Sequence, residues 1–182
     1  MILVQLSDFA GFHVLARSVQ NDGILQAYIT RFEERFIKLI LGATLGQLYI
    51  DDKSQPTQDP IYAAIEDAFM LDDTNSSGWV WESNSWNSIR ESKGLKDVLI
   101  SLIYSEFVFD TQTKHSQSGV TINQSEVANN NSPENAARFA EQKWNEALTS
   151  ISAIQWYCTS FAPTDYVDYN GKEFTPKYSS FL

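Results

Sequence analysis

The chain has 182 residues, 23 Asp and Glu against 13 Lys and Arg, a formal net charge of −10 and an aromatic content of 13%. One cysteine excludes an intrachain disulfide, and two histidines leave too few ligands for a Cys/His zinc site. So acidic a chain is not expected to hold nucleic-acid phosphates. No stretch is long and apolar enough to span a membrane, and Asp8 interrupts the apolar start that a signal peptide needs. We therefore expect a protein that is made, or assembled, in the cytoplasm.

A long amphipathic helix is predicted from residue 22 to residue 50. Its apolar residues recur at i, i+3, i+4 and i+7 and include Phe32 and Phe36. Gly42 and Gly46 predict a break or bend near its end, because glycine is costly inside a helix. The remaining positions carry charges that predict an ion-paired, solvated face: Arg31, Glu33, Glu34, Arg35 and Lys38.

A shorter helix is predicted after a loop over residues 51–60. Asp59 suits the N-cap and Pro60 the first helical position, so the helix is expected to continue to about Met70.

Residues 72–92 are rich in turn formers, and Trp79-Val80-Trp81 within them allows a short strand. The run from Asp73 to Gly78 matches the opening half of a calcium loop. Asn84 stands where such a loop needs a bidentate glutamate, which favours a plain turn and leaves calcium binding undecided.

Two further helices follow. Residues 97–109 are hydrophobic on nearly all sides, which predicts a helix surrounded by others. Ser132 as N-cap and Pro133 at the first position predict the start of a second long helix, which continues to about Cys158. The predicted core of the bundle draws on all three long helices: Phe32, Phe36, Leu99, Leu102, Ile103, Trp144 and Leu148.

Residues 111–131 form a polar arm. Of the 22 residues from 111 to 132, 14 are Ser, Thr, Asn or Gln, and such a segment buries little of itself. Gly119 precedes Val120-Thr121-Ile122, whose alternation predicts one strand of a hairpin. We expect a projecting loop or β-hairpin that is ordered by a partner.

Residues 159–182 form an irregular tail, because Pro163, Gly171 and Pro176 interrupt it. Aromatic residues recur through the tail and need a surface, either the chain's own bundle or a neighbouring subunit. We assign these arm and tail residues to an interface with another subunit: Ser118, Gly119, Val120, Ile122, Tyr166, Tyr169, Phe174, Tyr178 and Phe181.

The predicted fold class is mainly α. One domain, residues 1–182, is expected to form a helical bundle of about four helices with a helical core at about 22–158, the polar arm and an extended C-terminal tail.

Catalytic chemistry finds little support in the sequence. Neither a nucleophile-elbow motif nor a phosphate-binding glycine loop is present. His13 lies in an apolar context and His115 in the polar arm, and neither has a nucleophile or acid at a recognisable spacing. Cys158 lies on the inner stripe of its helix, where a buried structural thiol is expected. We therefore predict no enzyme, no cofactor and no metal site.

The order of these features resembles the head-to-tail adaptor (connector or ring) proteins of tailed bacteriophages, most closely those of Bacteroides-type and crAss-like phages. The likeness covers roughly residues 20–156. Three segments carry it: residues 28–49 around Phe36-Ile37-Lys38-Leu39-Ile40-Leu41-Gly42, residues 102–108 running into the polar arm, and Asn129-Asn130-Asn131-Ser132-Pro133 followed by Lys143-Trp144-Asn145.

This resemblance implies a structural virion protein at the neck, between head and tail. Such adaptors form a dodecameric ring below the portal, extend the DNA channel, and dock the next ring, a stopper or the tail. DNA would pass through the lumen without specific binding, and no membrane would be involved. Two alternatives stay open: a monomeric cytoplasmic protein that binds one host partner, and a small hydrolase with unrecognised acids.

Overall fold

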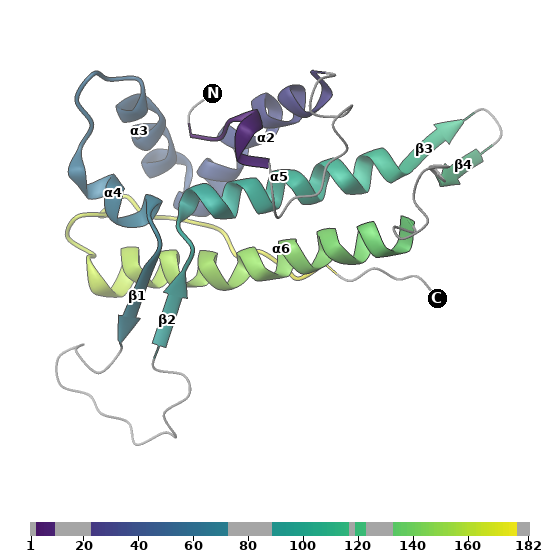
Figure 1. Cartoon of the computed structure of the whole chain (residues 1–182). Coiled ribbons are helices and arrows are strands. Elements are labelled where there is room, and N and C mark those ends of the chain that lie inside the picture. Colours follow the sequence, from purple (N-terminus) through teal and green to yellow (C-terminus); the bar gives the residue numbers. More distant parts are fainter. Residues whose placement is uncertain (1–2, 10–22, 73–88, 117–118, 123–132, 178–182) are drawn as a thin grey trace.

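The computed structural model describes residues 3–9, 23–72, 89–116, 119–122 and 133–177, and over these residues the fold is mainly helical, as predicted (Figure 1). The α-helices are α2 (Ile24–Leu41), α3 (Ala43–Lys53), α4 (Pro60–Glu66), α5 (Leu95–Gln112) and α6 (Pro133–Trp156). A 3₁₀-helix η1 (Leu6–Phe9) precedes them and a π-helix η3 (Tyr157–Phe161) extends α6. Strand β1 (Phe69–Asp72) pairs with β2 (Ile89–Ser92), and β3 (Thr113–Ser116) pairs with β4 (Gly119–Ile122), both antiparallel.

Helix α5 lies at the centre of the bundle, between α2 and α6, and α6 runs antiparallel to it (Figure 1). Its predicted core residues Leu99, Leu102 and Ile103 are fully buried. The Ser105 hydroxyl lies 2.7 Å from the Ala140 carbonyl oxygen of α6, so a buried polar contact joins the two helices. The apolar sequence of α5 thus has the surrounded position that it predicted.

Aromatic side chains join α2 to this pair. Phe32 and Phe36 are 5% and 4% exposed, and the Phe36 ring meets the Trp144 indole edge-on at 6.2 Å. Leu148 is partly buried and packs against the same core. These contacts place the predicted core residues of α2 and α6 around α5.

The predicted break in the first long helix lies at Gly42, between α2 and α3. Gly42 has φ 92°, a conformation that costs other residues strain. A Cβ there would lie 2.7 Å from the backbone of Asn170, because the C-terminal segment passes directly over this position. Gly46 lies within α3 and does not interrupt it.

The prediction that the short helix continues to Met70 is wrong. Asp59 caps α4 as expected, accepting a hydrogen bond of 3.0 Å from the Ile61 amide. The helix ends at Glu66, and the aromatic and apolar side chains that follow enter strand β1 instead. Trp79-Val80-Trp81 and the segment from Asp73 to Asn84 lie outside the described residues.

The prediction that Glu33 lies on a solvated face is also wrong. Its carboxylate is 2% exposed and accepts backbone hydrogen bonds of 2.6 Å from Leu3 and 2.7 Å from Val4. It therefore fixes the N-terminal segment to α2. Its neighbour Glu34 is exposed and pairs with Lys38, as predicted for a surface residue.

Candidate functional site

The β3–β4 ribbon is the described part of the polar arm. Strand β3 follows α5 without a break and, with β4, extends beyond the first turn of α6 (Figure 1). Val120 pairs with His115 and Ile122 with Thr113, so the alternation at Val120-Thr121-Ile122 did indicate a strand. Among the described residues this sheet consists of β3 and β4. Within the described part of the chain, the outer edges of the ribbon therefore have no third strand.

Of the interface residues assigned to the arm, Gly119, Val120 and Ile122 lie in β4. Ser118 lies outside the described residues, as do His13, Ser132, Tyr178 and Phe181 of the other predictions.

The β1–β2 ribbon was missed in the sequence. Phe69 packs against Tyr157 with ring centres 5.3 Å apart, and the Lys93 amide that follows β2 donates a 3.1 Å hydrogen bond to Ser150 of α6. These two contacts attach the ribbon to α6 and to η3. Met70, the next residue of β1, is 66% exposed to solvent. The short apolar run Phe69-Met70-Leu71 could have indicated strand β1 in the sequence.

Residues 170–177 of the C-terminal segment cross the bundle as a strap. Its Asn170 and Lys172 amides donate hydrogen bonds of 3.2 and 2.8 Å to the carbonyl oxygens of Leu41 and Leu39, which the end of α2 leaves without helical partners. Further along, the Trp144 indole N–H donates to the Thr175 carbonyl at 3.0 Å. The strap thus joins α2 to α6.

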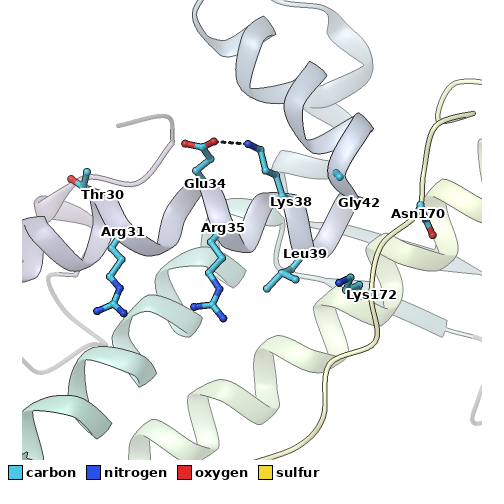
Figure 2. Close-up of a pocket in the computed structure, with 10 residues that line it drawn as sticks. Thr30, Arg31, Glu34, Arg35, Lys38, Leu39, Gly42, Asn170 and Lys172 are labelled. Carbon is cyan, nitrogen blue, oxygen red and sulfur yellow. Dashed lines mark hydrogen bonds and ion pairs between the residues drawn. The ribbon is translucent and has the colours of Figure 1, made fainter.

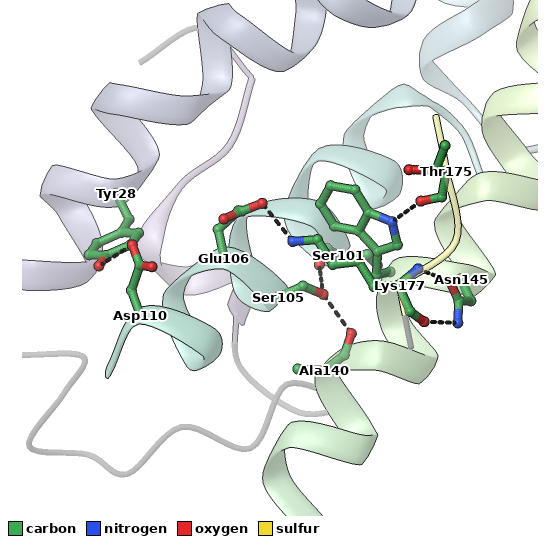
Figure 3. A network of polar contacts seen from close by, with 10 residues as sticks. Tyr28, Ser101, Ser105, Glu106, Asp110, Ala140, Asn145, Thr175 and Lys177 are labelled. Carbon is green, nitrogen blue, oxygen red and sulfur yellow. Dashed lines mark hydrogen bonds and ion pairs between the residues drawn. The ribbon is translucent and has the colours of Figure 1, made fainter. Parts of the chain in front are cut away.

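Lys177 closes the strap at its far end (Figure 3). Its ammonium donates a 2.7 Å hydrogen bond to Glu106 Oε1 of α5 and lies 3.8 Å from the centre of the Trp144 ring. Asn145 binds the Lys177 backbone twice, accepting from its amide at 3.1 Å and donating to its carbonyl at 3.0 Å. The strap therefore contacts α2, α5 and α6.

This arrangement corrects part of the interface assignment. Tyr166 is 3% exposed and its hydroxyl donates to the Ile61 carbonyl oxygen, so it belongs to the chain's own core. Tyr169 and Phe174 are partly buried against that core, Phe174 at 6.3 Å from Trp144. Of the two surfaces that we considered for the tail aromatics, the chain's own bundle takes these three.

A basic groove lies beside the strap. One hollow of about 550 Å³ runs along α2 to Asn170 and Lys172, and a second of about 430 Å³ lies between α2, α5, α6 and the strap. Arg31 and Arg35 line both and point toward α5 and α6, whereas Glu34 and Lys38 point the other way (Figure 2). The guanidinium carbons of Arg31 and Arg35 lie 5.1 and 5.9 Å from the centre of the Phe32 ring.

The ion-paired surface that the sequence predicted is thus present in part. Lys38 pairs with Glu34, but no described carboxylate lies within 4.0 Å of Arg31, Arg35 or Lys172. Glu106 and Asp110 line the second hollow, and both have partners, Lys177 and Tyr28. The groove therefore holds three cations without a carboxylate partner among the described residues.

Burial raises the pKa of titratable side chains, among them Cys158 and Tyr28. Cys158 is 1% exposed, and burial raises the pKa of its thiol to about 12, which keeps it protonated and unreactive at neutral pH. Burial, with the hydrogen bond to Asp110, also raises the pKa of Tyr28 to about 12. Within the described residues, no group of three or more His, Cys, Asp and Glu side chains could hold a metal ion.

None of the helices in the described part of the chain has the length and apolarity needed to cross a bilayer. Comparison with protein-family models, with curated proteins and with solved structures finds no match to this chain.

Proposed function

We propose that this chain is a structural head-to-tail adaptor of a tailed bacteriophage. Twelve copies would form a ring between the portal and the tail, assembled in the host cytoplasm and retained in the neck of the virion. The ring would extend the DNA channel and dock the portal on one side and the next ring, a stopper or the tail on the other. The work would be done by binding surfaces, without catalysis or a cofactor.

The observation that carries the proposal is the β3–β4 ribbon beyond the end of the helical core. A two-stranded ribbon is marginally stable by itself in water. Its two outer edges offer backbone N–H and C=O groups to a further strand, which is how extended segments of a partner add to a sheet. In a ring of identical copies, one such contact between neighbours repeats around the axis until the ring closes.

The rest of the chain supports the same proposal. The strap and the aromatic packing around Trp144 join α2, α5 and α6, which suits a rigid ring segment. A net charge of −10 on each copy would give the ring a surface that repels phosphate, so that DNA moves through it without being held.

The test replaces residues 113–131 by a Gly/Ser linker and follows the mass of the assembly by mass photometry, alone and with the portal protein of the same phage. We expect the variant to keep its far-UV helical signal and to lose ring formation and portal binding. The matched control replaces residues 73–88, between β1 and β2, by a similar linker. Normal rings from the arm variant would contradict the proposal, and a full-length chain that stays monomeric with the portal would favour a monomeric host-binding protein.

A further inference from the structure

The basic groove and one exposed turn of the C-terminal segment have complementary chemistry. The groove lies at Arg31, Arg35 and Lys172, and the turn covers residues 162–169. We infer that the groove of one copy binds the turn of a second copy of this chain. The inference rests on the proposed ring, because it names a surface through which neighbouring copies would meet.

The groove is preorganised for carboxylates. Arg31 and Arg35 are one helical turn apart on α2, so their side chains emerge from neighbouring positions on one face. Both guanidinium groups lie over the Phe32 ring. An arginine held on an aromatic face keeps the N–H groups at the edge of its plane free, and that edge matches the two oxygens of a carboxylate.

Apolar side chains contribute part of the surface between these charges. Phe174 and Leu39 are partly exposed in the second hollow, and the almost buried Phe36 and Trp144 lie beneath them. The volume of this hollow, about 430 Å³, is within the range of protein binding sites. An occupant with an apolar side chain between acidic ones would therefore match both the apolar and the charged side chains.

The turn at residues 162–169 presents that combination. Val167 is 80% exposed, and Asp165 and Asp168 lie on either side of it in the sequence. Both aspartates are exposed, and no described cation lies within 4.0 Å of either carboxylate. A single exposed apolar side chain is ordinary on a protein surface, and what distinguishes Val167 is its position between two carboxylates that have no described cation beside them.

The turn is also held in place from within. The Asp165 amide donates to the Ala162 carbonyl at 3.1 Å and the Tyr169 amide to the Tyr166 carbonyl at 3.0 Å, which closes two successive turns. Tyr166 between them is buried, and its hydroxyl donates to the Ile61 carbonyl oxygen of α4. A turn that is already ordered loses little conformational entropy when it binds, so this entropy loss weakens binding only slightly.

The number of charges argues for protein rather than nucleic acid as the occupant. Glu106 and Asp110 of the same hollow have Lys177 and Tyr28 as partners, and Arg31 and Arg35 match the two carboxylates of one turn but are too few to hold a continuous phosphate backbone. Every copy of the chain carries both the groove and the acidic turn, so the two are always present at equal concentration.

The test uses two full-length variants. R31E/R35E reverses the groove and leaves the turn intact, whereas D165R/D168R reverses the turn and leaves the groove intact. We expect sedimentation velocity to show wild-type self-association, weakened about tenfold or more in each variant alone and by 1 M salt. An equimolar mixture should recover association, because the intact groove of one variant then meets the intact turn of the other and the reversed groove meets the reversed turn. R31Q/R35Q removes the positive charges without adding acidic ones and should also weaken association. This variant keeps the test decisive if R31E/R35E does not fold.

The outcomes separate this inference from the proposed function. A wild-type chain that stays monomeric alone, or variants that associate as the wild type does, would overturn the inference and leave portal binding to decide the function. Association that depends on groove and turn but stops at a dimer would support the inference and contradict the ring. Labelled duplex DNA that binds wild type at 150 mM salt but not R31Q/R35Q would overturn the inference in favour of nucleic acid.

Discussion

The ammonium group of Lys177 lies 3.8 Å from the centre of the Trp144 indole ring and at the same time donates a 2.7 Å hydrogen bond to Glu106. One side chain of the C-terminal segment thus contacts both α5 and α6. This contact explains why an irregular tail lies on the bundle: its charge and backbone groups find partners there as well as its aromatic rings.

Lys177→Gln removes both the ion pair and the cation–π contact. We expect faster amide hydrogen exchange over residues 170–177 and a loss of about 1 kcal/mol in the free energy of unfolding, since the Lys177 and Glu106 side chains are 32% and 23% exposed. Lys172→Gln is the matched control, because that side chain has no ion pair among the described residues. Equal exchange in the two variants would contradict the role of Lys177.

Glu33→Gln tests the buried carboxylate that holds the N-terminal segment. Both the Leu3 and Val4 amides donate to one oxygen, Oε1, so the glutamine oxygen can accept both hydrogen bonds but lacks the negative charge that strengthens them. The expected loss is about 1–3 kcal/mol in urea unfolding. Glu34→Gln, on the exposed face beside it, should change stability by about 0.5 kcal/mol or less. Equal effects would show that the burial of Glu33 does not matter.

Gly42→Ala tests the close passage of the strap over the helix break. Both glycines have positive φ, and an alanine strains the backbone by about 1–2 kcal/mol at Gly23 (φ 67°, ψ −8°) and by more at Gly42 (φ 92°, ψ 164°), whose conformation is essentially restricted to glycine. A Cβ at Gly42 additionally meets the Asn170 backbone at 2.7 Å, whereas a Cβ at Gly23 meets nothing within 4 Å. Urea unfolding should therefore show a larger loss for Gly42→Ala than for Gly23→Ala. Similar losses would mean that the strap moves away from Gly42 freely.

Cys158 predicts a dependence of stability on alkaline pH. Its pKa is raised from 9.0 to about 12 in the folded chain, so below pH 9 both states keep the proton and pH has no effect through this group. Between pH 9 and 12 the unfolded chain loses the proton first, and stability falls by up to about 1.4 kcal/mol per pH unit. Cys158→Ala should show a shallower fall in the same buffers. Parallel slopes would contradict burial of the thiol.

Local patterns in the sequence were enough to predict the helices and one hairpin strand. The continuous apolar run of α5 placed it at the centre, Pro133 marked the start of α6, and the alternation at Val120-Thr121-Ile122 indicated a strand. Each of these signals lies within a few neighbouring residues, where periodicity and capping act.

Contacts between distant segments could not be predicted in this way. The strap binds carbonyl oxygens at the end of α2 through backbone amides, which have no sequence signature. Strand β1 pairs with β2 across residues 73–88, and nothing local in Phe69-Met70-Leu71 names that partner. Glu33 looked like its neighbour Glu34, because periodicity alone does not show which charged position lies beneath another segment. The groove at Arg31 and Arg35 depends on the strap and was missed for the same reason.

The account depends most on assembly through the arm, and the mass of the full-length chain with the portal protein of the same phage tests it most directly. Native mass spectrometry should find about twelve copies of the 20.6 kDa chain on each portal ring, and replacement of residues 113–131 should remove them all. A chain that remains a monomer beside the portal at every concentration would contradict the account.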